Sequence, residues 1–463
     1  MLQPVQTVSD EGLVRAIGLR SAVLLVVGSV IGSGIFLTTG DMATRIPSAS
    51  LLLAAWVLGG VLVIAGGLTY AEMGAMFPRS GGVYVFLREA YGGLPAFLYG
   101  WTSLLVVISG STAAVAVGFA EYLSYFLPTL STSHIVLALP VPWGTFSISA
   151  GQLVAAASIA VLGAVNYVGV RSGNMVNVVL TAAKVAGLLA IPAMALAYGA
   201  VEPSYTPVVP VGTVRPLASF GIAMIAVLWT YEAWYYVTYA AGEIKDPQRN
   251  VPRALVIGVL ALIGIYVVVN VAYLHALTID DMKGVTRIAE KAASVLMGPA
   301  GAGFVALTVV ISTFGCNAAG ILGGSRVLFA MGLDGVFLPA ASRVHPRYRT
   351  PHVAILALTV WSIVLALSGT YEQLFTYVMF SSILFNVATG AALFRLRRTH
   401  PDQPRPYLAW GYPVVPAVFV LGSGAFVLNT LIERPVESIA GLGLLLIGLP
   451  VYWYTRSGDR PIG

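Results

Sequence analysis

Long apolar stretches, separated by short polar segments, run through almost the whole chain. A helix needs about 17 apolar residues to cross a bilayer, and by that measure the pattern predicts twelve spans. The expected spans are residues 21–39, 51–76, 94–127, 147–169, 175–198, 217–241, 254–277, 300–330, 352–367, 374–396, 413–431 and 438–454. No polar linker between them is long enough to separate soluble domains, so we expect one transmembrane domain over residues 1–463.

The composition agrees with this pattern. Hydrophobic residues make up 58% of the chain and charged residues only 10%, whereas roughly 25% of residues are charged in soluble domains. The mean hydropathy is +0.86. We therefore expect an all-α integral membrane protein whose surroundings are the lipid bilayer.

The distribution of charge predicts the orientation. Most of the 25 lysines and arginines lie in loops on the side of the N-terminus. Because these residues concentrate in cytoplasmic loops, we expect a multi-pass protein of the plasma or inner cell membrane with both termini in the cytoplasm. The net charge of +6 then reflects topology and not nucleic-acid binding. The single cysteine, Cys316, falls within an expected span, so no disulfide-linked heavy subunit is expected.

The first expected span contains GSVIGSGIF at residues 28–36, a segment that does not suit a continuous helix. Each glycine costs roughly 1 kcal/mol in a helix interior. Gly32 lies about 18 Å along a helix from Arg20, near the middle of a ~30 Å hydrocarbon core. Irregular backbone at this depth is tolerated where it lines a cavity, so we expect a helix break and a binding site there.

The freed backbone groups of this segment suit a small zwitterion. Amides of Gly32, Ser33 and Gly34 would begin a half-helix whose dipole favours a carboxylate. Carbonyls of Val30 and Ile31 would accept hydrogen bonds from an ammonium group. The alternative is that the glycines only permit close helix packing.

The spans divide into two halves of similar length, at residues 21–198 and 217–396, followed by two further helices at residues 413–454. Five helices per half require the second half to be inverted relative to the first. Its first helix has an unusual centre, LWTYEAWYY at residues 228–236, where a carboxylate interrupts an apolar run. We therefore expect helices 1 and 6 to be discontinuous.

Four motifs together resemble the amino acid–polyamine–organocation superfamily. They are GSVIGSGIF at 28–36, AEMGAMFPRSGG at 71–82, GEIKDP at 242–247 and STFGCNAAGILGGSR at 312–326. Within the superfamily the sequence is most similar to the L-type amino acid transporters and their bacterial relatives. The resemblance implies a LeuT-like fold, with five plus five inverted helices and two appended, and alternating access around a central amino acid site.

The resemblance also implies roles for residues of the sixth span. Trp229 matches an aromatic gate over the substrate, and Thr230, Glu232 and Ala233 join it in the expected substrate site. Glu232 departs from the L-type pattern, which tends to have glycine there. A carboxylate near half depth costs about 2.5 to 3.5 kcal/mol on insertion scales, and it usually faces a cavity. It could pair with a substrate cation, carry a proton, or remain neutral and hydrogen-bonded to a tyrosine.

Two further residues are expected to couple the site to transport. Lys184 lies deep within the fifth span, where an ammonium needs carbonyl or hydroxyl partners. In the resembling family this lysine occupies the place of a sodium ion in sodium-coupled relatives, and Ser312 is the matching hydroxyl of the eighth helix. Sodium coupling is therefore not expected. The alternative for Lys184 is a purely structural tether.

Several other polar residues have weaker assignments. Ser109, Ser111 and Asn317 are candidates for lining the pathway. Glu72, near the cytoplasmic end of its span, is expected to pair with loop arginines or to cap a helix.

Together these features predict a secondary active transporter for a small, neutral L-amino acid, working as an exchanger or with protons. A cationic amino acid or polyamine transporter is the alternative, and a sensor or channel has less support. The five histidines are scattered, and no metal-spaced cluster or nucleophile motif indicates an enzyme, a metal or a cofactor.

Overall fold

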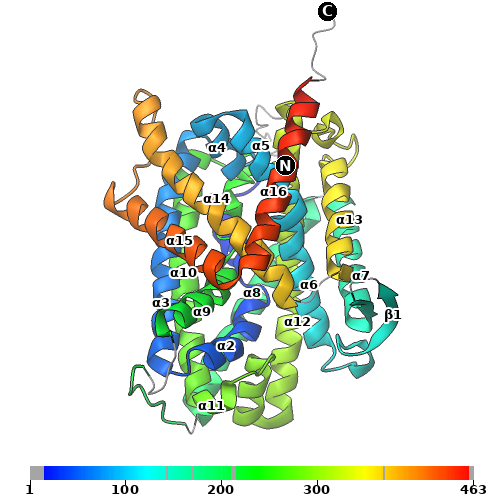
Figure 1. Ribbon diagram of the computed structural model, residues 1–463, viewed down its shortest axis with the longest axis vertical. Helices are drawn as coiled ribbons and strands as arrows, with labels where there is room; N and C mark the ends of the chain where they lie inside the picture. The colour runs from blue at the N-terminus through cyan, green and yellow to red at the C-terminus, as the bar shows by residue number, and fades with distance from the viewer. Residues whose placement is uncertain are drawn as a thin grey trace, which may run out of the picture.

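A computed structural model describes residues 15–457, except 142–143, 169, 200, 210–214 and 369–370. In this part of the chain nearly all regular structure is helical, and most helices run roughly along the long axis of the molecule (Figure 1). Nine of the described helices are long and apolar enough to cross a membrane, or ten if the bent pair α1 and α2 is one span. Two shorter apolar helices, His352–Ser368 and Ser438–Tyr454, coincide with the ninth and twelfth expected spans.

Most of the helices overlap the expected spans, with bounds that differ in several places. They are α1 (Leu19–Val30), α2 (Gly34–Arg45), α3 (Ala49–Met76), α4 (Val83–Tyr91), α5 (Gly93–Thr102), α6 (Ile108–Leu123), α7 (Ala150–Val168), α8 (Val170–Tyr198), α9 (Pro216–Tyr231), α10 (Pro247–Ala276), α11 (Ile279–Met282), α12 (Ile288–Leu333), α13 (His352–Ser368), α14 (Tyr371–Thr399), α15 (Val414–Glu433) and α16 (Pro435–Ser457). A π-helical turn, η1 (Ser103–Val107), joins α5 to α6. Short 3₁₀ segments are η2 (Pro128–Leu130), η3 (Tyr236–Thr238), η4 (Ala241–Glu243) and η5 (Pro339–Ser342).

The expectation of purely α-helical structure needs one correction. Strands β1 (Ile135–Val141) and β2 (Gly144–Ser149) pair as an antiparallel hairpin beside α7 (Figure 1). The fourth span therefore begins at Ala150 and not at residue 147. Its expected end, Gly169, lies outside the described residues. The hairpin is rich in apolar residues, so hydropathy alone merges its second strand with the span that follows.

The first span is interrupted at its glycine-rich segment. Helix α1 ends at Val30 and α2 begins at Gly34, with a bend of 41° between them. Gly34 allows a close approach to α9, because a Cβ atom there would lie 2.9 Å from the Cα of Thr230. The two broken helices therefore meet at this point.

Helix α9 ends at Tyr231, half-way along the expected sixth span. Glu232 is extended (ψ 160°) and Ala233 has a positive φ of 70°, a combination that stops the α-helix. The chain continues through turns and the short segments η3 and η4, so the second half of this span is not an α-helix.

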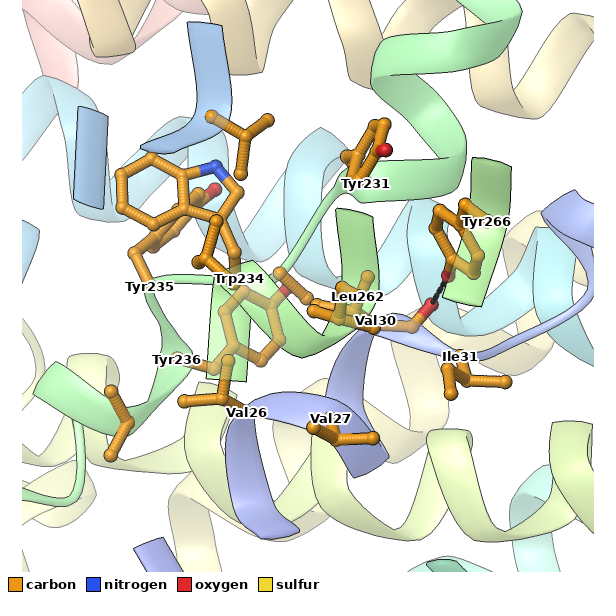
Figure 2. Packing of buried hydrophobic residues seen from close by; sticks show 14 of the residues in the cluster. Val26, Val27, Val30, Ile31, Tyr231, Trp234, Tyr235, Tyr236, Leu262 and Tyr266 are labelled. Carbon is orange, nitrogen blue, oxygen red and sulfur yellow. Dashed lines mark hydrogen bonds between the residues drawn. The ribbon is translucent and has the colours of Figure 1, made fainter. Parts of the chain in front are cut away.

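Tyr266 of α10 holds the two breaks together. Its hydroxyl lies 3.3 Å from the Val30 carbonyl and 3.1 Å from the Thr230 carbonyl, and the two carbonyls share its single hydrogen. Figure 2 shows its ring above the end of α1, with a hydrogen bond to Val30 and the Tyr231 ring nearby. The hydroxyl thus satisfies carbonyls that the broken helices leave without intrahelical donors.

The end of the molecule that contains α4, at the top of Figure 1, is closed by polar contacts. The Ile17 amide donates to the Glu243 carbonyl at 3.0 Å, and the Lys245 amide donates to the Ile17 carbonyl at 2.9 Å. Arg326 of α12 forms a buried ion pair with Glu243 at 2.9 Å. These contacts join three parts of the chain: the N-terminal segment, the loop that follows α9, and helix α12. They lie between the centre of the molecule and this end, which carries most of the arginines and is called the arginine-rich end below.

Candidate binding pocket at the helix breaks

A small pocket of about 40 Å³ lies where the two helix breaks meet α6 and α12. Every residue expected in the substrate site lines it except Ile31. Those that line it are Val30, Gly32, Ser33, Gly34, Trp229, Thr230, Glu232 and Ala233. Segments that are distant in the sequence therefore converge on one cavity, as the resemblance implied.

The start of α2 presents its backbone amides at this pocket. The first amides of a helix have no intrahelical acceptor, and the helix dipole places partial positive charge there. Ser33, the residue before α2, makes no side-chain cap, and its Oγ lies 3.1 Å from the hydroxyl of Tyr371. The amides at Ser33 and Gly34 are thus suited to bind a carboxylate.

The carbonyls expected to bind an ammonium group already have donors. The Ile31 carbonyl accepts from Lys184 Nζ at 2.9 Å and from Ser312 Oγ at 3.0 Å. The Val30 carbonyl accepts from Tyr266. Ile31 consequently belongs to the surroundings of Lys184 and not to the pocket wall.

Lys184 and Ser312 come together at the break after α1, where both donate to the Ile31 carbonyl. Both side chains are fully buried. Besides the Ile31 carbonyl, Lys184 Nζ donates to the Gly28 carbonyl at 2.5 Å. The lysine of α8 and the serine of α12 therefore hold the last turn of α1 from two directions.

An aromatic cluster covers the other side of the pocket. Trp229 Nε1 donates to the Tyr371 hydroxyl at 2.9 Å, and the Phe375 ring stacks on Trp229 with 5.8 Å between ring centroids. Beyond this cluster lies a wider cavity of about 690 Å³, which Tyr371 and Phe375 also line together with Asp41. Trp229 thus lies between the small pocket and an outer vestibule.

Glu232 lines the pocket with its side chain almost buried, at 7% exposure. Its Oε1 accepts from Ser382 Oγ of α14 at 2.7 Å and from the Tyr235 hydroxyl. No cationic side chain pairs with it in the part of the chain that the structure describes. The carboxylate therefore lies beside the pocket with two hydroxyl groups and the Ala233 backbone as its hydrogen-bond donors.

Sequence reasoning missed several residues of the site. Tyr371 and Phe375 lie at the start of α14, and nothing in the local sequence marks them as neighbours of Trp229. The walls from α6 and α12 also went unassigned, except that Ser111 and Asn317 were weak candidates; both line the pocket, whereas Ser109 does not. The other unassigned lining residues are Ser29, Thr112, Val115, Tyr236, Cys316 and Gly320.

A bundle of membrane-capable helices, two of them broken around a central pocket, is the architecture of a transporter for small solutes. Comparison with known sequences gives the family. The sequence model described as amino acid permease matches residues 17–449, so the chain belongs to that family. It is an amino acid transporter of the amino acid–polyamine–organocation superfamily, and not an enzyme.

Relatives are similar along nearly their whole length. The serine/threonine exchanger SteT of Bacillus subtilis is 31% identical over 96% of this chain and 97% of its own. The b(0,+)-type amino acid transporter 1 of Mus musculus is 30% identical, covering 95% of this chain and 88% of its own. The human large neutral amino acids transporter small subunit 2 is 29% identical, covering 95% and 80%.

Proposed function

We propose that the protein is a secondary active transporter for a small, neutral L-amino acid, which it moves across the cell membrane by alternating access. The observation that carries this proposal is the pocket of about 40 Å³ between the start of α2 and the end of α9. One water needs about 10–15 Å³ of such space, so a pocket of this size favours the smallest substrates. The names of the relatives range from serine/threonine to large neutral amino acids, and the pocket supports the small end of that range.

The proposal includes the LeuT-like arrangement: twelve spans, with repeats at residues 21–198 and 217–396, and both termini in the cytoplasm. The breaks after Val30 and after Tyr231 support it, because each interrupts the first helix of one of these repeats. The closed arginine-rich end would then face the cytoplasm, and the vestibule beyond Trp229 would face the outside.

Transport is proposed to be independent of sodium. The Lys184 ammonium lies among the Gly28 and Ile31 carbonyls, with Ser312 beside it, and these are the oxygen ligands that a cation would otherwise use. A second cation at the same oxygens would be repelled by the lysine charge. Exchange and proton coupling both remain compatible with this arrangement, and Glu232 is the group proposed to carry a proton.

Uptake into proteoliposomes tests the proposal. Purified protein is supplied with a panel of radiolabelled amino acids, with and without internal substrate, sodium or a pH gradient. We expect uptake of small neutral L-amino acids without sodium. Stimulation by internal substrate without a pH effect would select exchange, whereas a requirement for external acid would select proton coupling. Material that transports no amino acid would contradict the proposal.

A cationic substrate is the second candidate, because Glu232 lines the pocket and no cation among the described residues pairs with it. Arginine, lysine and putrescine therefore belong in the competition panel. Competition by these cations that disappears in Glu232→Gln, while alanine still competes, would favour this candidate over the neutral one.

Replacing Lys184 with alanine tests the coupling role. The substitution removes both hydrogen bonds to the end of α1 but leaves Ser312 on the Ile31 carbonyl. We expect folded, membrane-inserted protein with turnover lowered by about tenfold or more. Wild-type uptake by this variant would reduce Lys184 to a structural tether.

A further inference from the structure

Helices α6 and α12 form the end of the pocket where the side chain of a bound amino acid would lie. A methyl group placed on Gly32 would lie 3.6 Å from Val115, so this part of α6 lies against the helix break. Ser111 is one helical turn, or about 6 Å, nearer the arginine-rich end. It therefore lies beyond the backbone amides that suit the substrate carboxylate, where the substrate side chain would extend.

Ser111 offers an unused hydrogen bond at this position. It lines the pocket, yet its Oγ is buried and has no hydrogen-bond partner among the described residues. Buried hydroxyls are normally paired, and a missing partner costs free energy. The π-helical turn Ser103–Val107 directly precedes α6 and adds a residue to the helical turn, which rotates the following residues. Such turns are frequent at functional sites.

Asn317 of α12 adds a second polar group. Its Nδ2 donates to the Thr112 carbonyl at 3.1 Å, which fixes the amide and leaves Oδ1 as an acceptor at the pocket. Gly320, one turn further along α12, leaves the space beside them open, because a Cβ built there would meet nothing closer than Thr112 Oγ1 at 3.8 Å. This end of the pocket therefore offers a donor, Ser111 Oγ, an acceptor, Asn317 Oδ1, and room for a short group beside them.

We propose that Ser111 and Asn317 select amino acids that carry a hydroxyl group on a short side chain, and that Gly320 sets the size limit. This inference rests on the proposed function, since it assumes an amino acid with its carboxylate at the start of α2. A substrate hydroxyl would donate to Asn317 Oδ1 and accept from Ser111 Oγ. An alanine side chain would leave both groups unpaired, which is the situation in which a polar site rejects an analogue lacking the hydroxyl.

Competition against radiolabelled L-serine uptake in proteoliposomes tests the inference, with L-alanine, L-serine, L-threonine and L-leucine as competitors. We expect wild-type protein to bind serine roughly fivefold to tenfold more tightly than alanine. In Ser111→Ala this ratio should fall to about one, through weaker serine binding at unchanged alanine affinity. Gly320→Ala should weaken threonine more than serine, since the added methyl fills the open space.

Ser109→Ala is the matched control. Ser109 is another serine of α6 whose buried Oγ has no hydrogen-bond partner among the described residues, but it does not line the pocket. It should leave the serine-to-alanine ratio unchanged. Equal affinities for serine and alanine in wild-type protein, or an unchanged ratio in Ser111→Ala, would overturn the inference while amino acid transport stands. Failure to transport any amino acid would instead overturn the proposed function.

Discussion

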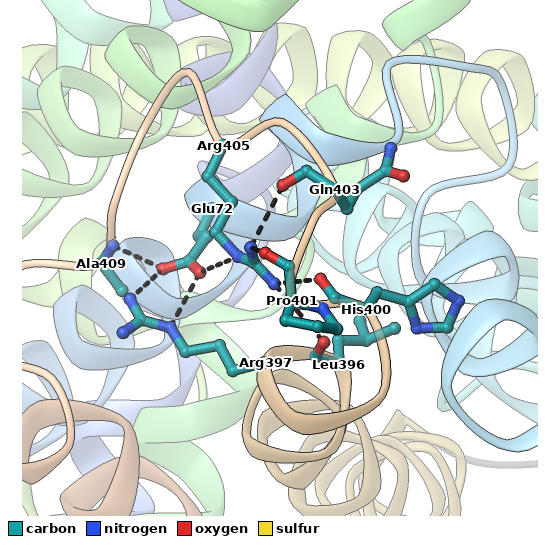
Figure 3. Close-up of polar contacts among 8 residues, drawn as sticks. All are labelled: Glu72, Leu396, Arg397, His400, Pro401, Gln403, Arg405 and Ala409. Carbon is teal, nitrogen blue, oxygen red and sulfur yellow. Dashed lines mark hydrogen bonds and ion pairs between the residues drawn. The ribbon is translucent and has the colours of Figure 1, made fainter.

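Two buried carboxylates in neighbouring regions of the molecule differ in what surrounds them. Glu72, near the end of α3, is fully buried and is held by Arg397, Arg405 and the Ala409 amide (Figure 3). Glu232, at the end of α9, is nearly as buried, but its hydrogen bonds come from two hydroxyl groups and the Ala233 backbone and not from arginines. The first charge is neutralised within the protein, whereas the second remains available to the pocket.

This difference separates a structural carboxylate from a functional one. A buried charge without a cation is costly, and it persists where the surroundings or a ligand stabilise it. Glu72 joins α3 to the end of α14 and to the loop before α15, and it touches no part of the pocket. Glu232 lines the pocket and reaches α14 only through Ser382. Substitution should therefore affect folding at the first site and transport at the second.

The largest effect on stability is expected from Glu72→Gln. The change leaves Arg397 and Arg405, which are 23% and 14% exposed, without their carboxylate. Breaking a buried ion pair by removing one partner costs about 3–5 kcal/mol, and we expect about 2–4 kcal/mol because these arginines reach some solvent. Thermal unfolding of the purified protein in detergent measures the loss.

Glu433→Gln is the control for the Glu72 variant. Glu433 pairs with Arg215, whose side chain is 66% exposed, and exposed ion pairs contribute little. The unfolding midpoint should hardly change in this variant. A Glu72 variant as stable as this control would contradict the structural role given to Glu72.

Glu232→Gln should leave stability near the wild-type value and impair transport. No ionic partner is lost, and glutamine can keep the hydrogen bonds from Tyr235 and Ser382. We expect uptake to fall by about tenfold or more and its pH response to flatten over about pH 5 to 8, because glutamine cannot exchange a proton. Uptake and exchange rates across this range measure both effects.

The pH profile of Glu232→Gln can exclude a role of Glu232 as proton carrier. If Glu232→Gln kept the wild-type pH profile in both uptake and exchange, the carboxylate would not carry a proton. If it lowered the unfolding midpoint as far as Glu72→Gln does, the two carboxylates would not differ in kind.

Arg397→Lys sharpens the structural half of the comparison. Arg397 donates to both oxygens of Glu72, at 2.9 Å and 2.6 Å, and its guanidinium stacks on the Tyr412 ring at 3.6 Å. A lysine keeps the charge but loses the paired geometry and the stacking. We expect a loss of about 1 kcal/mol in stability, measured by the same unfolding assay. A loss as large as that of Glu72→Gln would mean that geometry, and not charge, stabilises this cluster.

The helix break could be predicted from the sequence, whereas the aromatic residues that pack on Trp229 could not. Glycines at half depth of a span are costly in a helix, so they mark the interruption between Val30 and Gly34 locally. Tyr371 contacts Trp229 only because α14 packs across α9, and no local pattern encodes that contact. For the same reason the sequence does not show that the Ile31 carbonyl already has donors, because they come from α8 and α12.

The two carboxylates show the same division. The expected pairing of Glu72 with arginines is confirmed by its ion pairs with Arg397 and Arg405, because a charge near the end of a span lies close to loop cations. The partners of Glu232 were beyond sequence reasoning apart from a tyrosine, since Ser382 belongs to a helix far along the chain. The role of Glu232 stays a prediction for this reason.

Asp281 is an exposed carboxylate, in contrast to Glu72 and Glu232, and its substitution is expected to have the smallest effect. It caps α11 together with Thr278, whose hydroxyl donates to its carboxylate at 2.6 Å and whose amide donates at 3.4 Å. The hydrogen bonds from Thr278 hold the pKa of Asp281 below its ordinary value. A lowered pKa stabilises the folded cap at pH values above the ordinary pKa of about 3.9, and this contribution is lost as the pH falls through the folded value.

Amide hydrogen exchange over α11 measures this small effect. At neutral pH, Asp281→Asn should exchange slightly faster than wild-type protein in this helix alone, because asparagine cannot supply the charge at the helix start. The difference should disappear once the pH is low enough to protonate the aspartate of the wild-type protein. Transport at neutral pH should be unchanged, since Asp281 does not line the pocket or the vestibule. A transport defect in Asp281→Asn would show that burial and pocket contact do not decide which carboxylates serve transport. The distinction drawn between Glu72 and Glu232 would then fail, because it rests on those two properties.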